Sequence, residues 1–246
     1  MVFSKLAHIT RSIKLHQLRI QINSCPLCGH KFQVKLFNDE MGVRCLKCRG
    51  SAVTQSLAAV FDALTTGQNS LSVYELSSRG AWHRFLNQSS HRLTCSEYFD
   101  GIPLGEQVNG ISCQDVQQLT YADEQFDVCT SLEVFEHVED DHKGFSEIFR
   151  VLKPEGLMLF TVPLSGQTKT IERTAIIQGK RQQTLPAEYH SDSLRGAGQV
   201  FCFRNYGSDV IKRLESVGFT QVEIIEPHNK LYFGFGRPVI KAIKPK

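Results

Sequence analysis

The cysteines are the residues of this sequence whose type and spacing point most directly to a chemistry. Four of the eight form two Cys-x-x-Cys pairs, Cys25 with Cys28 and Cys45 with Cys48, separated by sixteen residues. Two residues between thiols allow a tight turn to direct both sulfur atoms at one point, and two such turns complete a tetrahedron around Zn²⁺. Because four protein ligands close the site, the sequence predicts a structural zinc ion. The alternative is a set of reduced cysteines without metal.

The other cysteines stand singly, at Cys95, Cys113, Cys129 and Cys202. Isolated cysteines inside apolar segments usually behave as small buried hydrophobic residues. They do not form the spacing pattern of a disulfide framework, so we expect a reducing compartment, the cytoplasm. No apolar run reaches the roughly 18–20 residues that span a bilayer, so no membrane association is expected.

Charge is distributed unevenly along the chain. Residues 1–50 carry nine Lys or Arg against two acids, whereas the remainder carries nineteen basic and twenty-three acidic residues. A basic N-terminal region (the head, residues 1–50) on a mildly acidic chain indicates either that the head binds an anionic partner such as nucleic acid or only that it has a solvated charged face. No cluster of aromatic and basic residues in the head indicates specific base stacking.

From residue 71 onwards, strand-like and helix-like segments alternate, which predicts βαβ units. We expect an α/β fold with a doubly wound, mostly parallel, Rossmann-like sheet that ends in an antiparallel strand, preceded by a small N-terminal zinc knuckle. The predicted organisation is a basic leader and zinc module over 1–50, and a connecting helix and linker over 51–70. The main domain follows over 71–246, with a lid-like insertion at about 165–204.

Acidic residues recur where the predicted strands end, at Glu75, Glu97, Asp115 and Glu133. In doubly wound folds the ligand lies outside the carboxyl ends of the strands. The loop after the first strand contains only Gly80, so it lacks the glycines with which dinucleotide binders cradle a pyrophosphate. A sulfonium cofactor instead presents a positive sulfur, an amino group and a ribose diol, which carboxylates suit. The pattern therefore favours S-adenosylmethionine over NAD.

Three motifs in order carry a resemblance to a known family. They are Asp115-Val-Gln-Gln-Leu-Thr-Tyr-Ala-Asp-Glu-Gln-Phe-Asp-Val, Ser131-Leu-Glu-Val-Phe-Glu-His-Val and Phe149-Arg-Val-Leu-Lys-Pro-Glu-Gly. Together they resemble the signature of class I S-adenosylmethionine-dependent methyltransferases with a type 11-like domain. The resemblance covers residues 71–164 well and residues 205–246 more loosely.

The resemblance implies a cofactor-binding set that follows the strand ends: Glu75, Ser77, Gly80, Glu97, Asp115, Val116, Leu132 and Glu133. Within it, Glu97 would accept hydrogen bonds from the ribose hydroxyls. Asp115 and Val116 would meet the adenine edge, and Leu132 and Glu133 would lie near the methyl group. The usual glycine-rich run is replaced here by Ser77, Ser78 and Arg79.

Three residues are candidates for catalysis. His137 follows the fourth strand and is a candidate base, although in this motif it also serves as a packing residue. Tyr189 and His190, with Glu188 before them, lie in the insertion that we expect to cover the cofactor, where they contact substrate or only anchor the lid.

The function expected from these patterns is methyl transfer to an unidentified small molecule or modified biomolecule. The alternatives are an RNA-binding or RNA-modifying protein that uses the basic head, and a catalytically inert interaction protein with the methyltransferase fold.

Overall fold

The computed structural model describes residues 17–38, 40–191, 199–226 and 232–246. Residues 1–16 of the expected basic leader lie outside these ranges. The chain divides into two compact units. Unit 1 is Met1–Ser70, Arg79–His91 and Ile225–Val239, and unit 2 is Leu71–Ser78, Arg92–Ile224 and Ile240–Lys246. The units therefore interleave along the chain, whereas the sequence predicted contiguous ranges.

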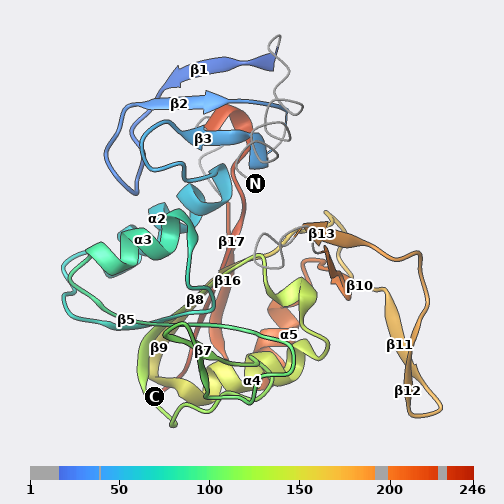
Figure 1. Cartoon of the computed structure of the whole chain (residues 1–246). Coiled ribbons are helices and arrows are strands. Elements are labelled where there is room, and N and C mark those ends of the chain that lie inside the picture. Colours follow the sequence, from blue (N-terminus) through green and yellow to red (C-terminus); the bar gives the residue numbers. More distant parts are fainter. Residues whose placement is uncertain (1–16, 39, 192–198, 227–231) are drawn as a thin grey trace. The chain divides into compact units, whose positions relative to one another are not determined.

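Unit 1 begins with a small antiparallel sheet. Its strands are β1 (Arg19–Ile22), β2 (Phe32–Lys35) and β3 (Val43–Cys45), in the order β1-β2-β3 (Figure 1). The short helix η2 (Glu40–Gly42) precedes β3. The buried side chain of Gln33 on β2 accepts a 2.9 Å hydrogen bond from Gln55 Nε2, and Gln55 also donates to the Gly50 carbonyl. Hydrogen bonds between buried amides of this kind fix one arrangement of the sheet against the following helix.

That helix, α2 (Ala52–Thr65), is the connecting helix predicted from the sequence. Ser51 caps its N-terminus by accepting a hydrogen bond from the Thr54 amide, as expected of a serine in this position. The returning segment of unit 1 also binds here, because the Arg237 amide donates to Ser56 Oγ and its guanidinium pairs with Glu40 at 2.7 Å. These contacts explain why residues 225–239 belong to the same unit as the N-terminal sheet.

Unit 2 is built on an eight-stranded sheet within the described residues, with the order β16-β17-β9-β8-β4-β5-β7-β6. Strands β4, β5, β7, β8 and β9 are mutually parallel, and β17 runs antiparallel to β9. From β4 the chain proceeds outward to β5 and β7, and then returns to the other side of β4 as β8 and β9. The strand order therefore reverses at β4. The predicted doubly wound sheet with an antiparallel closing strand is confirmed.

The strands of this sheet are β4 (Ser72–Glu75), β5 (Arg92–Glu97), β6 (Gln107–Val108), β7 (Ile111–Cys113), β8 (Phe126–Leu132), β9 (Leu152–Thr161), β16 (Thr220–Ile225) and β17 (Val239–Ile243). The helices between them are α3 (Gly80–Gln88), η3 (Phe135–His137), α4 (Asp141–Val151), α5 (Val210–Val217) and η4 (Tyr232–Gly234). No described helix is long and apolar enough to cross a membrane.

Helices α4 and α5 cover one face of the sheet with a continuous apolar core (Figure 1). Phe145 and Ile148 of α4 and Leu214 of α5 are fully buried against Phe160 and Ile240 of the sheet. The rings of Phe135 and Phe145 stack at 4.5 Å between centroids. This packing holds η3 against α4, and η3 directly follows the carboxyl end of β8.

Three local features do not follow from a periodic pattern in the sequence. The β6–β7 hairpin has strands of two and three residues, which are too few to show a period. Strand β9 begins at Leu152 directly after α4, so Lys-Pro-Glu-Gly forms an irregularity in its pairing with β8. Strand β17 begins only at Val239, and before it Phe233 and Gly234 have positive φ values of 58° and 83°.

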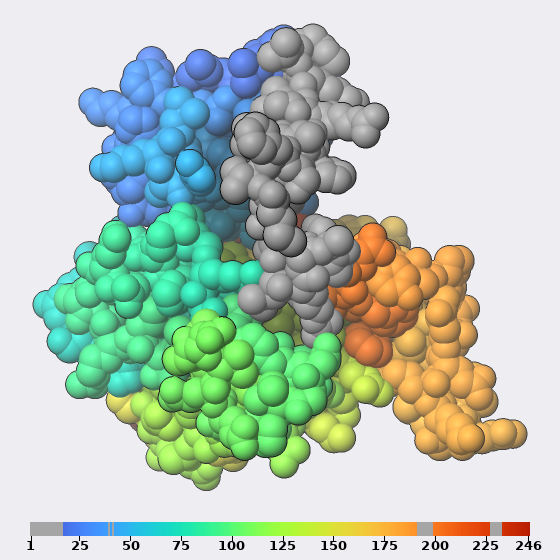
Figure 2. Space-filling model, viewed as in Figure 1, coloured from blue at the N-terminus to red at the C-terminus, as the bar shows by residue number. Residues whose placement is uncertain are grey.

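The insertion expected at 165–204 is a set of short antiparallel strand pairs. They are β10 (Ile171–Glu172) with β15 (Arg204–Asn205), β11 (Thr174–Ile177) with β12 (Lys180–Gln183), and β13 (Tyr189–Ser191) with β14 (Gln199–Phe201). In Figure 2 the orange atoms of the β11–β12 hairpin extend away from the yellow-green body of the same unit.

Candidate functional site

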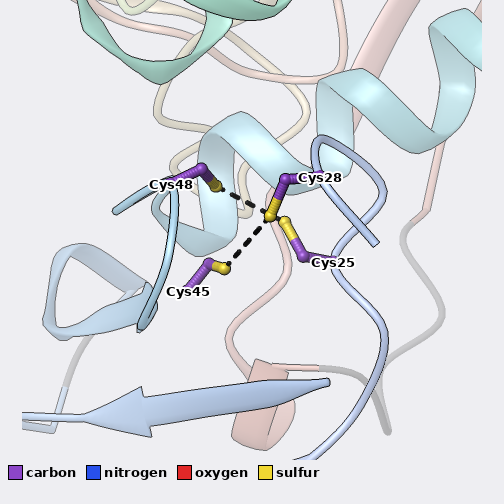
Figure 3. Close-up of side chains that lie close together, drawn as sticks. All are labelled: Cys25, Cys28, Cys45 and Cys48. Atoms are coloured by element: carbon purple, nitrogen blue, oxygen red, sulfur yellow. Dashed lines mark hydrogen bonds between the residues drawn. The ribbon is translucent and has the colours of Figure 1, made fainter. Parts of the chain in front are cut away.

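The four cysteines predicted to bind zinc lie together in unit 1 (Figure 3). Cys25 Sγ is 3.6 Å from Cys48 Sγ, and Cys28 Sγ is 3.6 Å from Cys45 Sγ, while all four sulfur atoms lie within 4.8 Å of one another. These separations exclude a disulfide, whose sulfur atoms are about 2.05 Å apart. They fit a tetrahedral Zn²⁺ with bonds of about 2.3 Å, for which the sulfur atoms lie roughly 3.8 Å apart.

Each cysteine pair is a tight turn closed by backbone hydrogen bonds. The amide of Gly29 donates to the Cys25 carbonyl at 2.8 Å, and the amide of Arg49 donates to the Cys45 carbonyl at 3.0 Å. Both residues adopt positive φ values, 67° for Gly29 and 64° for Arg49. Gly50, which follows the second turn, has a different role. A Cβ atom there would come within 2.5 Å of Leu27 in the first turn.

The thiols differ in acidity. Hydrogen bonding from Cys25 lowers the pKa of Cys48 to about 5, although burial opposes this shift. The same hydrogen bond, with burial, raises the pKa of Cys25, and burial raises the pKa of Cys45. The Cys48 carbonyl accepts a 2.9 Å hydrogen bond from Arg84 of α3. Three basic residues close in sequence to the cysteines are exposed, namely Lys31, Lys47 and Arg49. A nucleic-acid partner for this region stays a prediction.

All the predicted cofactor residues except Gly80, which belongs to unit 1, lie in unit 2, where they follow the carboxyl ends of strands on both sides of the reversal at β4. Glu75 ends β4 with its carboxylate 1% exposed, and it accepts a hydrogen bond from Thr130 of β8. In register Glu75 lies beside Cys95 of β5, two residues before Glu97. Residues two apart on a strand point to the same face, so Glu75 and Glu97 lie on the same side of the sheet. Burial and then the charges of these two carboxylates raise the pKa of the Cys95 thiol.

Glu97 is bound by the loop that follows β4. Its Oε1 accepts hydrogen bonds from the Ser78 amide at 2.8 Å, the Ser78 hydroxyl at 2.9 Å and the Ser77 hydroxyl at 3.4 Å. The serines that replace the expected glycines therefore direct their hydroxyls to the predicted ribose carboxylate. Gly80 has a φ of 86° with open space where a Cβ would stand. Arg79 is the N-cap residue of α3.

The remaining predicted cofactor residues have different surroundings. Asp115 Oδ1 accepts from the amide and the side chain of Gln117, at 2.9 and 3.1 Å, within its own loop. Val116 is buried in the core of unit 2, which includes Tyr74 and Phe135. Leu132 ends β8, and Glu133 follows with a φ of 53° and donates its amide to the Thr161 carbonyl. Their contacts to a cofactor stay predictions.

Two of the three predicted catalytic residues lie together. His137 Nε2 on η3 is 3.2 Å from His190 Nδ1 on β13, although the residues are 53 positions apart in the sequence. Tyr189 lies on the other face of β13, where it is 51% exposed and contacts the Phe201 ring. Neighbouring residues of a strand point to opposite faces, so Tyr189 cannot face His137 from β13 as His190 does.

Sequence reasoning missed Glu136, whose buried carboxylate lies 3.7 Å from both histidines. Its signal was its position beside His137 in the Glu-His-Val motif, where a carboxylate next to an imidazole indicates a polar site. Sequence reasoning also missed the role of Arg204, which no local pattern indicated. Its buried guanidinium donates to the carbonyls of Phe135, Val138 and Glu139 around η3.

Residues 79–160 match the model of a family described as a methyltransferase domain. This confirms the resemblance inferred from the three motifs, since the matched range contains all of them. No curated protein matches the chain.

The solved structures that this chain resembles share little sequence with it. An S-adenosylmethionine-dependent methyltransferase from Mesorhizobium loti has 15% identity and a TM-score of 0.49, covering 77% of this chain and 98% of its own. The 1,6-didemethyltoxoflavin N1-methyltransferase of Burkholderia thailandensis, with S-adenosylhomocysteine bound, has 14% identity and a TM-score of 0.49, covering 78% of each chain. The (4+2)-cyclase SpnF has 15% identity and a TM-score of 0.50, covering 78% of this chain and 82% of its own.

The cyclase shares the fold with this chain, and its name shows that the fold serves reactions other than methyl transfer. Fold alone does not define an activity. The matched domain and its motifs support S-adenosylmethionine-dependent methyltransferase activity for this chain.

Proposed function

We propose that the chain transfers a methyl group from S-adenosylmethionine to a small-molecule or modified-biomolecule acceptor. The observation that carries the proposal is the pair of buried carboxylates, Glu75 and Glu97, at neighbouring strand ends beside the reversal of strand order at β4. Ligands of doubly wound sheets bind in the crevice at such a reversal. The match of residues 79–160 to a methyltransferase domain selects the cofactor.

The residues at this edge fit the cofactor. Glu97 already accepts hydrogen bonds from two hydroxyl groups, those of Ser77 and Ser78. A ribose diol presents the same two donors, so it would replace or extend these bonds without a new charge in the site. The cofactor supplies an electrophilic methyl group. The chain then has to hold an acceptor in line with that group and exclude water.

We also propose that Cys25, Cys28, Cys45 and Cys48 bind one structural Zn²⁺. The four sulfur atoms complete the coordination shell, which leaves no position for a substrate. The ion would stabilise β1, β2 and β3, since a sheet of strands with only three or four residues is too small to be stabilised by a hydrophobic core alone.

Calorimetric titration of the full chain with S-adenosylmethionine and S-adenosylhomocysteine tests the main proposal. Glu97→Gln is expected to weaken binding of both nucleosides at least tenfold, because an amide nitrogen replaces one charged acceptor and hydrogen bonds to charged groups contribute about 1.5–3 kcal/mol. The amide oxygen of the variant can still accept the bonds from Ser78, so the loop should stay folded.

Glu106→Gln is the matched control, because Glu106 is an exposed carboxylate before β6. It should bind both nucleosides as the wild type does. Wild-type protein that gives no heat with either nucleoside would refute the proposal and identify an inert relative. Binding that Glu97→Gln leaves unchanged would show that the cofactor does not occupy this edge.

A further inference from the structure

We infer that Glu136, His137 and His190 form a second metal site, for a divalent transition-metal ion, at the carboxyl end of β8. The site is distinct from the four cysteines. All its residues belong to unit 2, where η3 supplies the first two and β13 supplies the third.

The three ligand atoms form a triangle of the right size. His137 Nε2 and His190 Nδ1 are 3.2 Å apart, and each is 3.7 Å from Glu136 Oε1. The centre of this triangle is about 2.1 Å from every corner. That is the bond length of roughly 2.0–2.2 Å that Zn²⁺ and similar ions keep with imidazole nitrogen and carboxylate oxygen.

Hydrogen bonds on the far sides of both rings orient their lone pairs toward this centre. His137 Nδ1 is 2.8 Å from the Phe201 carbonyl, which only accepts, so Nδ1 carries the proton and Nε2 has the lone pair. His190 Nε2 is 3.3 Å from Glu188 Oε1, which also acts as the acceptor. Neutral His190 therefore directs its Nδ1 lone pair at the same point. A carboxylate or carbonyl behind a histidine is the usual support of a metal ligand.

The arrangement requires a positive charge at its centre. Glu136 is 1% exposed, and no described residue donates a hydrogen bond to either of its carboxylate oxygens. A buried carboxylate with neither a hydrogen bond nor a neighbouring positive charge is strongly unfavourable, and His137 and His190, each 3.7 Å away, supply that charge only when protonated. Two lone pairs and this carboxylate facing one another would repel unless a cation lies between them.

The neighbouring cations are already engaged elsewhere. Arg173 pairs with Glu188, and Arg204 binds Glu172 and the carbonyls around η3. The charge at the centre must then be a metal ion, or a proton shared between His137 and His190. Cys202 lies near Glu188 and His190, but its thiol donates to the Arg204 carbonyl at 3.0 Å, so we leave it out of the ligand set.

The donor set indicates the class of ion and its use. Two imidazoles and one carboxylate suit zinc, iron(II) and related transition metals better than calcium. Three protein ligands leave coordination positions open, which distinguishes catalytic from structural sites. If the proposed function is correct, an open position would accept an oxygen atom of the acceptor and favour loss of its proton.

The site is tested by titrating Co²⁺ into the full chain while its cysteines keep their zinc. Wild-type protein should take up one Co²⁺ and show visible absorption bands without a thiolate-to-cobalt band. Glu136→Gln and His190→Gln should each weaken this binding at least tenfold, with unchanged circular dichroism. His142→Gln, at an exposed histidine of α4, is the matched control and should bind Co²⁺ normally.

Three outcomes would overturn the inference. They are no Co²⁺ uptake by the wild type, uptake that both variants retain, and a thiolate band that Cys202→Ser removes. The first would assign a shared proton to the histidine pair. Glu136→Gln should still bind S-adenosylmethionine like the wild type, so failure of the metal site and failure of the proposed function give different results.

Discussion

Arg204→Lys tests whether a buried guanidinium holds the segment that carries Glu136 and His137. Arg204 lies on β15 with its side chain 3% exposed. It donates to the carbonyls of Phe135 at 3.1 Å, Val138 at 2.5 Å and Glu139 at 2.9 Å, and pairs with Glu172 at 3.2 Å. The planar fork of arginine makes these bonds in several directions at once.

Lysine keeps the charge but has a single nitrogen, so at least two of these bonds are lost and their buried acceptors are left unpaired. Hydrogen bonds to charged groups contribute about 1.5–3 kcal/mol each, and leaving partners unsatisfied adds to the loss. We therefore expect the free energy of unfolding to fall by about 3–5 kcal/mol. Because native domains are stable by roughly 5–15 kcal/mol, the variant should still fold.

Urea unfolding at constant pH measures this difference, provided that the m value is unchanged. Arg92→Lys is the control, since Arg92 is exposed and donates only to Ser72 among the contacts described here, at 3.0 Å. It should change stability by no more than about 0.5 kcal/mol. If Arg204→Lys lowers the free energy of unfolding by less than about 1 kcal/mol, the reasoning is refuted, because the carbonyls around η3 would then be satisfied without the guanidinium group.

Two further predictions concern the zinc ion and the dependence of stability on pH. Elemental analysis should find a zinc ion that survives dialysis in the wild type and in Cys95→Ser but is lost in Cys48→Ser; equal zinc in all three would exclude the cysteine site. The pKa of Glu147 is lowered chiefly by hydrogen bonds from Arg150, at 2.8 Å to each carboxylate oxygen. Its contribution to stability is therefore present above the unfolded pKa of about 4.3 and is lost as pH falls through the lower folded value. Urea unfolding below about pH 5 should show a weaker loss of stability in Glu147→Gln than in the wild type, and equal slopes would contradict the assignment.

The sequence alone was sufficient for features that depend on nearby residues. Helix α2, helix α4 and the buried strand β9 follow from short apolar periods and their end signals. The two Cys-x-x-Cys turns are local as well, because each places two thiols on one side of a tight turn. The order of strands and helices, combined with the motif run that ends in Lys-Pro-Glu-Gly, predicted the doubly wound sheet.

Tertiary structure decided which distant residues meet. His137 and His190 form a pair only because β13 and β14 bring the insertion beside η3, and no periodicity encodes a contact across 53 residues. Glu136 becomes a candidate metal ligand only because the fold buries its carboxylate away from water and from hydrogen-bond donors. The bonds from Ser77 and Ser78 to Glu97 likewise depend on two parallel strands that lie in register. A sequence specifies residue types and local turns, whereas burial and convergence, which decide the electrostatics of a site, arise only when the chain is packed.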